Sequence, residues 1–213
     1  MPNDNSYKIR TKNRNLFLRV SPGHFATNHS HINYYIDVTT QKTRLSEAQA
    51  VANALVSYYT HNTIVDTVLC LDGTEVIGTC LADALTRGDF TNLNAHQTIY
   101  VITPEHTTGS QLIFRDNTLP AIASKNVLII AASVTTGYTA KSAVEAIRYY
   151  GGNVVGISSI FATVKECMGY AVNSVFDTDD LGDYSSFPSH ECPLCRAGKK
   201  IDALVNSFGY SKI

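Results

Sequence analysis

From about residue 45 onward, short apolar segments alternate with segments in which apolar residues recur every three or four positions. The apolar segments are 65–71, 98–102, 126–130 and 153–161, each of a length typical of a strand buried on both faces. Helical spacing predicts helices between them, over about 46–60, 76–85 and 140–150. This alternation predicts an α/β fold: a doubly wound, mainly parallel sheet with helices on both faces.

Three local signals refine these elements. Ser46-Glu-Ala-Gln49 has the form of a capping box and predicts that the first helix begins there. Gly151-Gly152 ends the last helix, because glycine tolerates a left-handed C-cap. The polar stretch 104–120 has no clear period, so it is expected to be a mobile loop or a hairpin.

Composition and charge limit the classes of partner. The 213 residues carry 17 Lys and Arg against 18 Asp and Glu, so no basic field is present to hold a nucleic-acid backbone. The longest apolar run, 127–132, is far shorter than the about 18 residues of a membrane span. The polar opening 1–6 has no signal-peptide core. We therefore expect a cytoplasmic protein with neither nucleic acid nor membrane as partner. No linker composition divides the chain, so we expect one globular domain.

The segment that follows the strand at 126–130 carries the clearest chemistry. Its sequence is Ser133-Val-Thr-Thr-Gly-Tyr-Thr139, directly before a helix. Amide N–H groups at a helix N-terminus, threonine hydroxyls and a glycine that permits close approach together favour phosphate binding. The alternative is an ordinary strand–turn–helix connection in which Thr136 or Thr139 is the N-cap.

Two of the five cysteines have the spacing of a metal half-site. His190-Glu-Cys192-Pro-Leu-Cys195 could place two thiolates on one structural zinc ion, with His190 as third ligand. The fourth ligand would come from Cys167, another residue or a neighbouring subunit. The alternative is a Cys-Pro turn with two packed thiols.

These motifs resemble a known family. Val134-Thr-Thr-Gly-Tyr-Thr139 is similar to the motif with which type I phosphoribosyltransferases bind phosphoribosyl pyrophosphate (PRPP). Gly23-His-Phe25 and the segment 31–37 resemble the N-terminal part of orotate phosphoribosyltransferases, and the Cys-Pro-Leu-Cys segment resembles one near the end of some of them. The resemblance implies a homodimer whose chain has an N-terminal hood at about 1–44, a core at about 45–180 and a C-terminal extension at about 181–213.

The resemblance also implies roles for particular residues. In the presence of Mg²⁺, PRPP would lose pyrophosphate while a nucleobase nitrogen captures C1 of the ribose. Tyr35 would stack on the base, although tyrosines at strand spacing are more often core residues. His106 and Arg115 would close over the pyrophosphate, although an exposed arginine is also typical of a solvated loop. The pyrophosphate loop would consist of Asp72, Gly73, Thr74 and Glu75, and the phosphate loop of Ser133, Thr135, Thr136, Gly137, Tyr138 and Thr139.

Two departures from the family pattern leave more than one function open. Ala131-Ala132 stands where the family has two acidic residues, and the loop 104–117 offers only His106 and Arg115 as cations. Asp72 and Glu105 could restore the lost contacts from new positions. The first hypothesis is an enzyme of nucleotide synthesis or salvage that uses orotate or another pyrimidine. The alternative is a non-catalytic sensor of PRPP or a nucleotide. A dinucleotide-binding oxidoreductase is disfavoured, because no Gly-x-Gly-x-x-Gly follows a strand.

Overall fold

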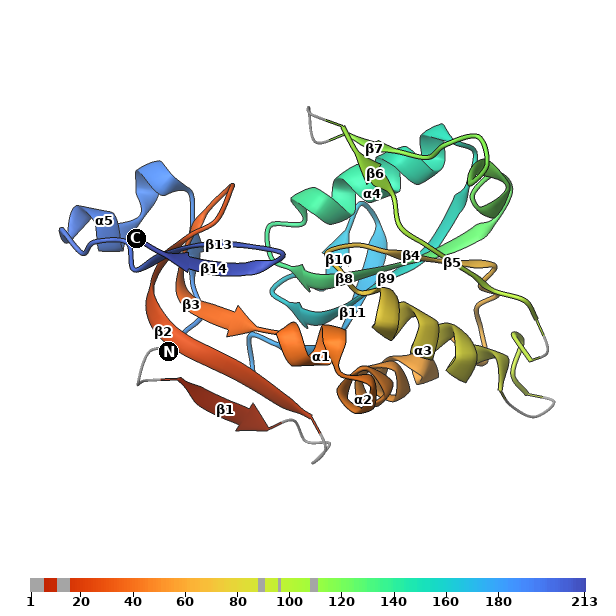
Figure 1. Ribbon diagram of the computed structural model, residues 1–213, viewed down its shortest axis with the longest axis horizontal. Helices are drawn as coiled ribbons and strands as arrows, with labels where there is room; N and C mark the ends of the chain where they lie inside the picture. Colours follow the sequence, from red (N-terminus) through yellow and green to blue (C-terminus); the bar gives the residue numbers. More distant parts are fainter. Residues whose placement is uncertain (1–5, 11–15, 88–90, 96, 108–110) are drawn as a thin grey trace. The chain divides into compact units, whose positions relative to one another are not determined.

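The structure is a computed structural model that describes residues 6–10, 16–87, 91–95, 97–107 and 111–213. The chain divides into two compact units (Figure 1). Unit 1 combines Met1–Thr40 with Phe176–Ile213, and unit 2 is Gln41–Val175. Within the described residues, no helix is long and apolar enough to cross a membrane.

Unit 2 is built on the predicted parallel sheet. The strands lie in the order β10-β11-β9-β8-β4-β5, and β9, β8, β4 and β5 run parallel to one another. The four apolar segments form these parallel strands, as the alternating pattern predicts. The bounds are β4 Thr67–Cys70, β5 Tyr100–Ile102, β8 Asn126–Val134, β9 Asn153–Ala162, β10 Glu166–Cys167 and β11 Tyr170–Asp177.

Helices cover both faces of this sheet (Figure 1). α2 (Leu45–Leu55) packs on α3 (Glu75–Thr86), which contacts β4 and β5, whereas α4 (Tyr138–Tyr149) packs on β8 and β9. Along β4 the side chains alternate accordingly: Leu69 belongs to the core cluster under α4, and Cys70 faces Gly78 of α3. The doubly wound α/β fold is thereby confirmed.

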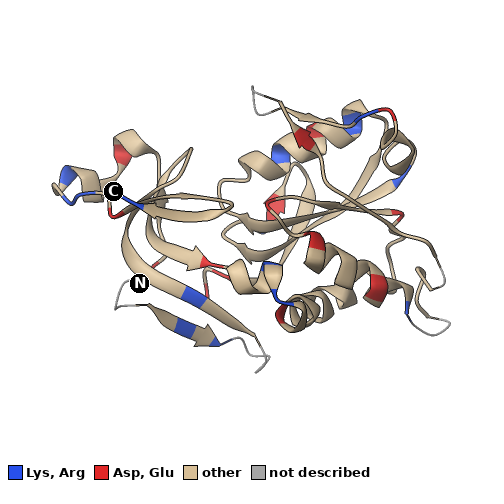
Figure 2. Ribbon diagram, in the orientation of Figure 1, with Lys and Arg blue, Asp and Glu red and all other residues tan. Residues whose placement is uncertain are grey.

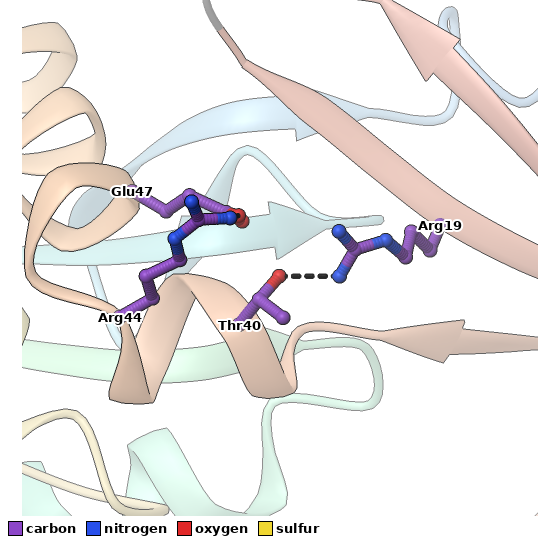
Figure 3. Close-up of polar contacts among 4 residues, drawn as sticks. All are labelled: Arg19, Thr40, Arg44 and Glu47. Atoms are coloured by element: carbon purple, nitrogen blue, oxygen red, sulfur yellow. Dashed lines mark hydrogen bonds and ion pairs between the residues drawn. The ribbon is translucent and has the colours of Figure 1, made fainter.

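The ends of the helices follow the sequence signals only in part. The capping box was a wrong prediction: α2 begins one residue earlier, its N-cap is Arg44, and no side chain caps it. Glu47 instead forms an exposed ion pair with Arg44 at 3.5 Å (Figure 3). The glycine C-cap of α4 is confirmed, because Gly151 has φ +78° and the N–H of Gly152 donates to the carbonyl of Ile147.

The polar stretch 104–120 contains a short hairpin. Its strands are β6 (Glu105–His106) and β7 (Leu112–Ile113), which pair antiparallel, and a 3-10 turn follows at Leu119–Ala121. Of the two structures expected for this stretch, the described residues form the hairpin.

Unit 1 joins the N-terminal and C-terminal parts of the chain in one sheet. The strands lie in the order β12-β3-β2-β13-β14, with β1 also paired to β2. β13 runs parallel to β2, and the other described pairs are antiparallel. Figure 3 shows Arg19 of this unit donating a hydrogen bond to Thr40. The bounds are β1 Tyr7–Arg10, β2 Phe17–Ala26, β3 His31–Asp37, α1 Thr39–Thr43, β12 Ser186–Phe187, α5 Pro193–Arg196, β13 Ala203–Asn206 and β14 Gly209–Lys212, α1 continuing into unit 2.

Candidate functional site

The two predicted phosphate-binding segments meet at one point of the sheet in unit 2. β4 and β8 are neighbours, but β5 lies beyond β4 on one side and β9 lies beyond β8 on the other. The chain therefore leaves β4 and β8 in opposite directions, and such a switch point is where open α/β sheets bind ligands. Residues 72–75 follow β4 and residues 135–139 follow β8, so the two loops flank this point.

Hydrogen bonds fix the first loop to the second strand. The N–H of Leu71 donates to the carbonyl of Ile130 at 2.8 Å. The hydroxyl of Thr74, a fully buried residue, lies 2.8 Å from the carbonyl of Leu71 and 3.1 Å from that of Ile130. Thr74 thus holds the loop in place with its side chain and leaves ligand contact to its neighbours.

Both loops use backbone conformations that favour glycine. Asp72 and Gly73 have φ +57° and φ +77°, and Gly137 has φ +73° at the N-cap of α4. No side chain caps α4, so the alternative in which Thr136 or Thr139 is the N-cap is wrong. A left-handed residue before a helix turns successive N–H groups toward one point, and such an arrangement binds anions.

The phosphate loop also presents side chains at its surface. Ser133, Thr136 and Tyr138 are exposed, whereas Thr135 and Thr139 are partly buried. The carbonyl of Thr135 accepts a hydrogen bond from the hydroxyl of Thr163 at 2.8 Å, which ties the loop to the end of β9.

A half-buried carboxyl group of the first loop, that of Asp72, reaches the backbone of Ala132 in β8. Burial raises the pKa of Asp72, while Lys42, the N–H of Ala132 and His106 act in the opposite direction. The hydrogen bond with Ala132 places this carboxyl beside the position at which the family resemblance leads one to expect an acidic pair. Asp72 thus brings a carboxyl group to the carboxyl end of β8.

Lys42 is a contact that the sequence did not indicate. Its Nζ donates to the backbone carbonyl of Asp72 at 2.8 Å. A lysine in a short polar helix has no distinguishing spacing, and only the fold brings it to the loop after β4. It adds a positive charge next to the predicted pyrophosphate loop.

The hairpin β6-β7 carries the two predicted cationic residues. His106 lies close enough to Asp72 to influence its pKa, as described above. Arg115 binds Glu105 through two hydrogen bonds, with Nε 2.7 Å from one carboxylate oxygen and Nη2 2.5 Å from the other. Arg115 is thus held at the base of the hairpin by a bidentate pair.

Comparisons with known proteins agree with this geometry. No family model matches the sequence. A curated orotate phosphoribosyltransferase from Caldanaerobacter subterraneus subsp. tengcongensis is 30% identical over 74 residues, which are 35% of this chain and 38% of that protein. The match therefore spans well under half of that relative.

Solved structures extend the likeness to most of the chain. The orotate phosphoribosyltransferase of Mycobacterium tuberculosis in complex with PRPP is 19% identical, covers 70% of this chain and 83% of its own, and has a TM-score of 0.51. The adenine phosphoribosyltransferase of Leishmania tarentolae is 16% identical, covers 70% of this chain and 78% of its own, and also has a TM-score of 0.51. This chain has the type I phosphoribosyltransferase fold. The sequence match is to an orotate phosphoribosyltransferase, whereas the similar structures include both orotate and adenine phosphoribosyltransferases.

Tyr35, the residue predicted to stack on the base, belongs to the buried apolar cluster of unit 1. Tyr35 is 8% exposed and packs on Phe25 and Tyr210, with ring centroids 6.0 Å and 4.9 Å apart. Burial raises its pKa to about 12. These surroundings are typical of a core residue, which is the alternative that its strand spacing also indicated.

The C-terminal cysteines form a cluster with residues other than the predicted one. Cys192 and Cys195 lie with His24 and His31, and one ligand atom of each lies within 4.8 Å of the others. The predicted third ligand, His190, is not part of this cluster, and its exposed ring lies 3.4 Å from Glu191. Cys167 belongs to unit 2, where its Sγ lies 3.8 Å from the carbonyl oxygen of Gly137. Both histidines lie in the segments 23–25 and 31–37, whose sequence signal is the family resemblance rather than the spacing of a metal site.

Proposed function

We propose that this protein binds PRPP at the switch point of unit 2 and transfers its ribose 5-phosphate to a nucleobase, with orotate or another pyrimidine favoured. The observation that supports this most strongly is the convergence of two glycine-containing loops at the carboxyl ends of β4 and β8. That position is the ligand site of doubly wound sheets. The PRPP complex of the similar Mycobacterium tuberculosis enzyme supports the same ligand class.

Each loop has a distinct task in this proposal. The N–H groups and hydroxyls of residues 133–139 hold the 5′-phosphate at the N-terminus of α4, where the helix dipole favours an anion. The loop 72–75 binds pyrophosphate through its backbone, with Lys42 and Glu75 beside it. Holding the sugar and the leaving group in fixed positions is the main contribution that such a site makes to rate.

The residues present also fit Mg²⁺. Asp72 supplies the oxygen-donor chemistry that Mg²⁺ prefers, next to the loop that would hold pyrophosphate. Bound Mg²⁺ would neutralise charge on the departing pyrophosphate. Asp72 would orient the ribose hydroxyls through its carboxylate, which the Ala132 N–H holds toward β8.

The alternative, a non-catalytic sensor of PRPP or a nucleotide, is favoured by two observations. Ala131 and Ala132 are buried small residues, so neither acidic residue of the family pattern is present at these two positions. Arg115 is paired with Glu105, which keeps its charge from acting alone on pyrophosphate. Removing preorganised charge from such a site typically costs a hundredfold or more in rate.

The test measures binding and turnover separately. Isothermal titration with PRPP and Mg²⁺ is followed by an assay of pyrophosphate release with orotate, uracil, xanthine, hypoxanthine and adenine in turn. Saturable binding with release for a pyrimidine supports the enzyme. Saturable binding without release for any base supports the sensor. Absence of PRPP binding contradicts both.

A further inference from the structure

We propose that unit 1 contains a structural zinc site whose four ligands are His24, His31, Cys192 and Cys195. The four ligand atoms lie within 4.8 Å of one another. Two thiolates and two imidazoles form the donor set that is typical of tetrahedral structural zinc. The inference is independent of the proposed function, because it rests on unit 1 alone.

The distances within the cluster match a tetrahedron. Bond lengths of about 2.0 Å to nitrogen and about 2.3 Å to sulfur place ligand atoms about 3.3 to 3.8 Å apart in a tetrahedron around one zinc ion. His24 Nε2 lies 3.5 Å from Cys192 Sγ and 3.6 Å from Cys195 Sγ. His31 Nδ1 lies 3.1 Å from His24 Nε2 and 3.2 Å from Cys195 Sγ. Small outward shifts of His31 complete the geometry.

The second nitrogen of His24 fixes its tautomer. Nδ1 lies 2.8 Å from the carbonyl of Lys199 and 3.2 Å from that of Lys200, and a carbonyl oxygen only accepts. Nδ1 therefore carries the hydrogen, and Nε2 turns a lone pair toward the other three groups. A backbone acceptor for the outer N–H is the usual partner of a metal-ligating histidine.

The same tautomer argues against a cluster of packed thiols. The single lone pair of Nε2 can accept one hydrogen, yet His31 Nδ1 and both sulfurs crowd around it. His24 and Cys192 are almost fully buried, with 0% and 1% exposure, so water cannot satisfy what remains. A zinc ion with two thiolates satisfies all four atoms and leaves the site electrically neutral.

The position of the cluster shows what the ion would do. His24 and His31 lie on β2 and β3, in the N-terminal part of the chain. Cys192 is the N-cap of α5 and Cys195 lies within that helix. His24 and Cys192 are 168 residues apart in the sequence. One buried apolar cluster of this sheet, formed by Phe25, Ile32, Tyr35 and Ala203, also joins the two parts of the chain. A metal bound by ligands from both parts would stabilise the folded unit, because the unfolded chain lacks the assembled site.

Metal analysis of the full chain tests the proposal. We expect about one zinc per chain after purification, and X-ray absorption at the zinc edge should show two sulfur and two nitrogen neighbours. Zinc below about half an equivalent, another metal in its place, or a shell of oxygens alone would overturn the proposal.

Variants test the ligand set. Cys195→Ser changes an exposed ligand and should reduce zinc content to below half of the wild-type value. His190→Ala, on the same segment, and Cys80→Ser, in α3, should retain the wild-type content. Zinc that is unchanged in Cys195→Ser, or lost in His190→Ala, contradicts the assignment, and cobalt substitution of the wild type gives a second readout through its thiolate charge-transfer band.

Discussion

At the scale of single residues, the site depends on side chains whose role only the fold reveals. The resemblance to the family predicted the segment 72–75 but could not say which of its side chains would meet a ligand. The structure divides their tasks: Thr74 is buried and holds the loop, whereas Asp72 places its carboxyl beside Ala132. Asp72 and Thr74 directly flank Gly73 in the sequence. Their spacing therefore cannot show which side chain holds the loop and which is available to a ligand.

Replacement of Asp72 by Asn should raise stability at neutral pH and weaken PRPP binding. Burial raises the pKa of this carboxyl above its ordinary value of 3.8, so its ionised form destabilises the fold. The folded chain is therefore most stable, as far as this group is concerned, below that ordinary value, and it loses stability as pH rises toward the raised pKa.

Thermal unfolding of the wild type and Asp72→Asn at pH of about 7 and about 3 measures this effect. The variant should unfold at a higher temperature at the neutral pH only, since both side chains are uncharged at the acid pH. A lower unfolding temperature at neutral pH would show that the carboxylate is net stabilising.

Replacement of Arg115 by Ala should show which end of PRPP this residue contacts, the pyrophosphate or the ribose 5-phosphate. If Arg115 faces pyrophosphate, Arg115→Ala weakens PRPP binding about tenfold and leaves ribose 5-phosphate binding unchanged, because the latter lacks pyrophosphate. Arg87→Ala is the matched control, since Arg87 also forms an exposed ion pair, with Asp83 at 2.7 Å. Equal effects of the two variants on PRPP binding would show that Arg115 is a solvated loop residue that does not contact pyrophosphate.

At the scale of elements, the sequence was most informative about strands and helices and least informative about their ends. The four parallel strands of unit 2, β4, β5, β8 and β9, were predicted, because short apolar segments between helical patterns leave few alternatives. β8 runs on to Val134 rather than ending near 130, since its small residues continue to pair with β9. α2 lacks the predicted cap because Arg44, not Ser46, stands at its N-cap.

The N-terminus of α4 should be sensitive to charge rather than to backbone strain. Gly137→Asp adds a carboxylate where phosphate is expected, and it should weaken both PRPP and ribose 5-phosphate by more than about tenfold. Gly151→Asp at the other end of α4 is the control, because Gly151 has a similar φ of +78° and open space around it. Titration of both ligands against both variants decides between charge and strain, and equal losses of affinity would indicate strain.

Close packing of α3 on β4 gives a second prediction at this scale. A Cβ at Gly78 would lie 2.3 Å from Cys70 Sγ, so Gly78→Ala should destabilise the protein by about 1 to 3 kcal/mol. In Gly78→Ala/Cys70→Ala the sulfur is absent and part of that loss should be recovered. Denaturant unfolding of both single variants and the double variant measures the coupling, and strictly additive losses would place the strain elsewhere.

At the scale of the whole molecule, the sequence did not predict that N-terminal and C-terminal strands form one sheet in unit 1. The core at 41–175 follows from the alternation of strands and helices. Unit 1 does not, because β2 and the short strand β13 lie far apart in the sequence and pair over only two residue positions. The cysteine spacing marked half of a metal site, but which histidines complete it depends on that pairing.

Removal of the proposed zinc should loosen unit 1 and spare unit 2. A metal that binds only the folded state stabilises the part of the molecule that holds it. Hydrogen exchange before and after treatment with a strong chelator should show loss of protection in 17–37 and 186–212, with unchanged protection in β4, β8 and β9. Uniform loss throughout the chain would mean that the two units unfold together.

The pairing of β13 between β2 and β14 has a consequence for synthesis of the chain. The β2–β3 hairpin is translated early, but its neighbour in the sheet emerges only after all of unit 2 has been made. Unit 2 can therefore acquire its native structure on the ribosome before β13 is made, while β2 pairs with β3 and, at residues 17–20, with β1. A truncation before residue 203 should leave the backbone of Phe25 and Ala26 unpaired on the β13 side, which opens that part of the sheet edge.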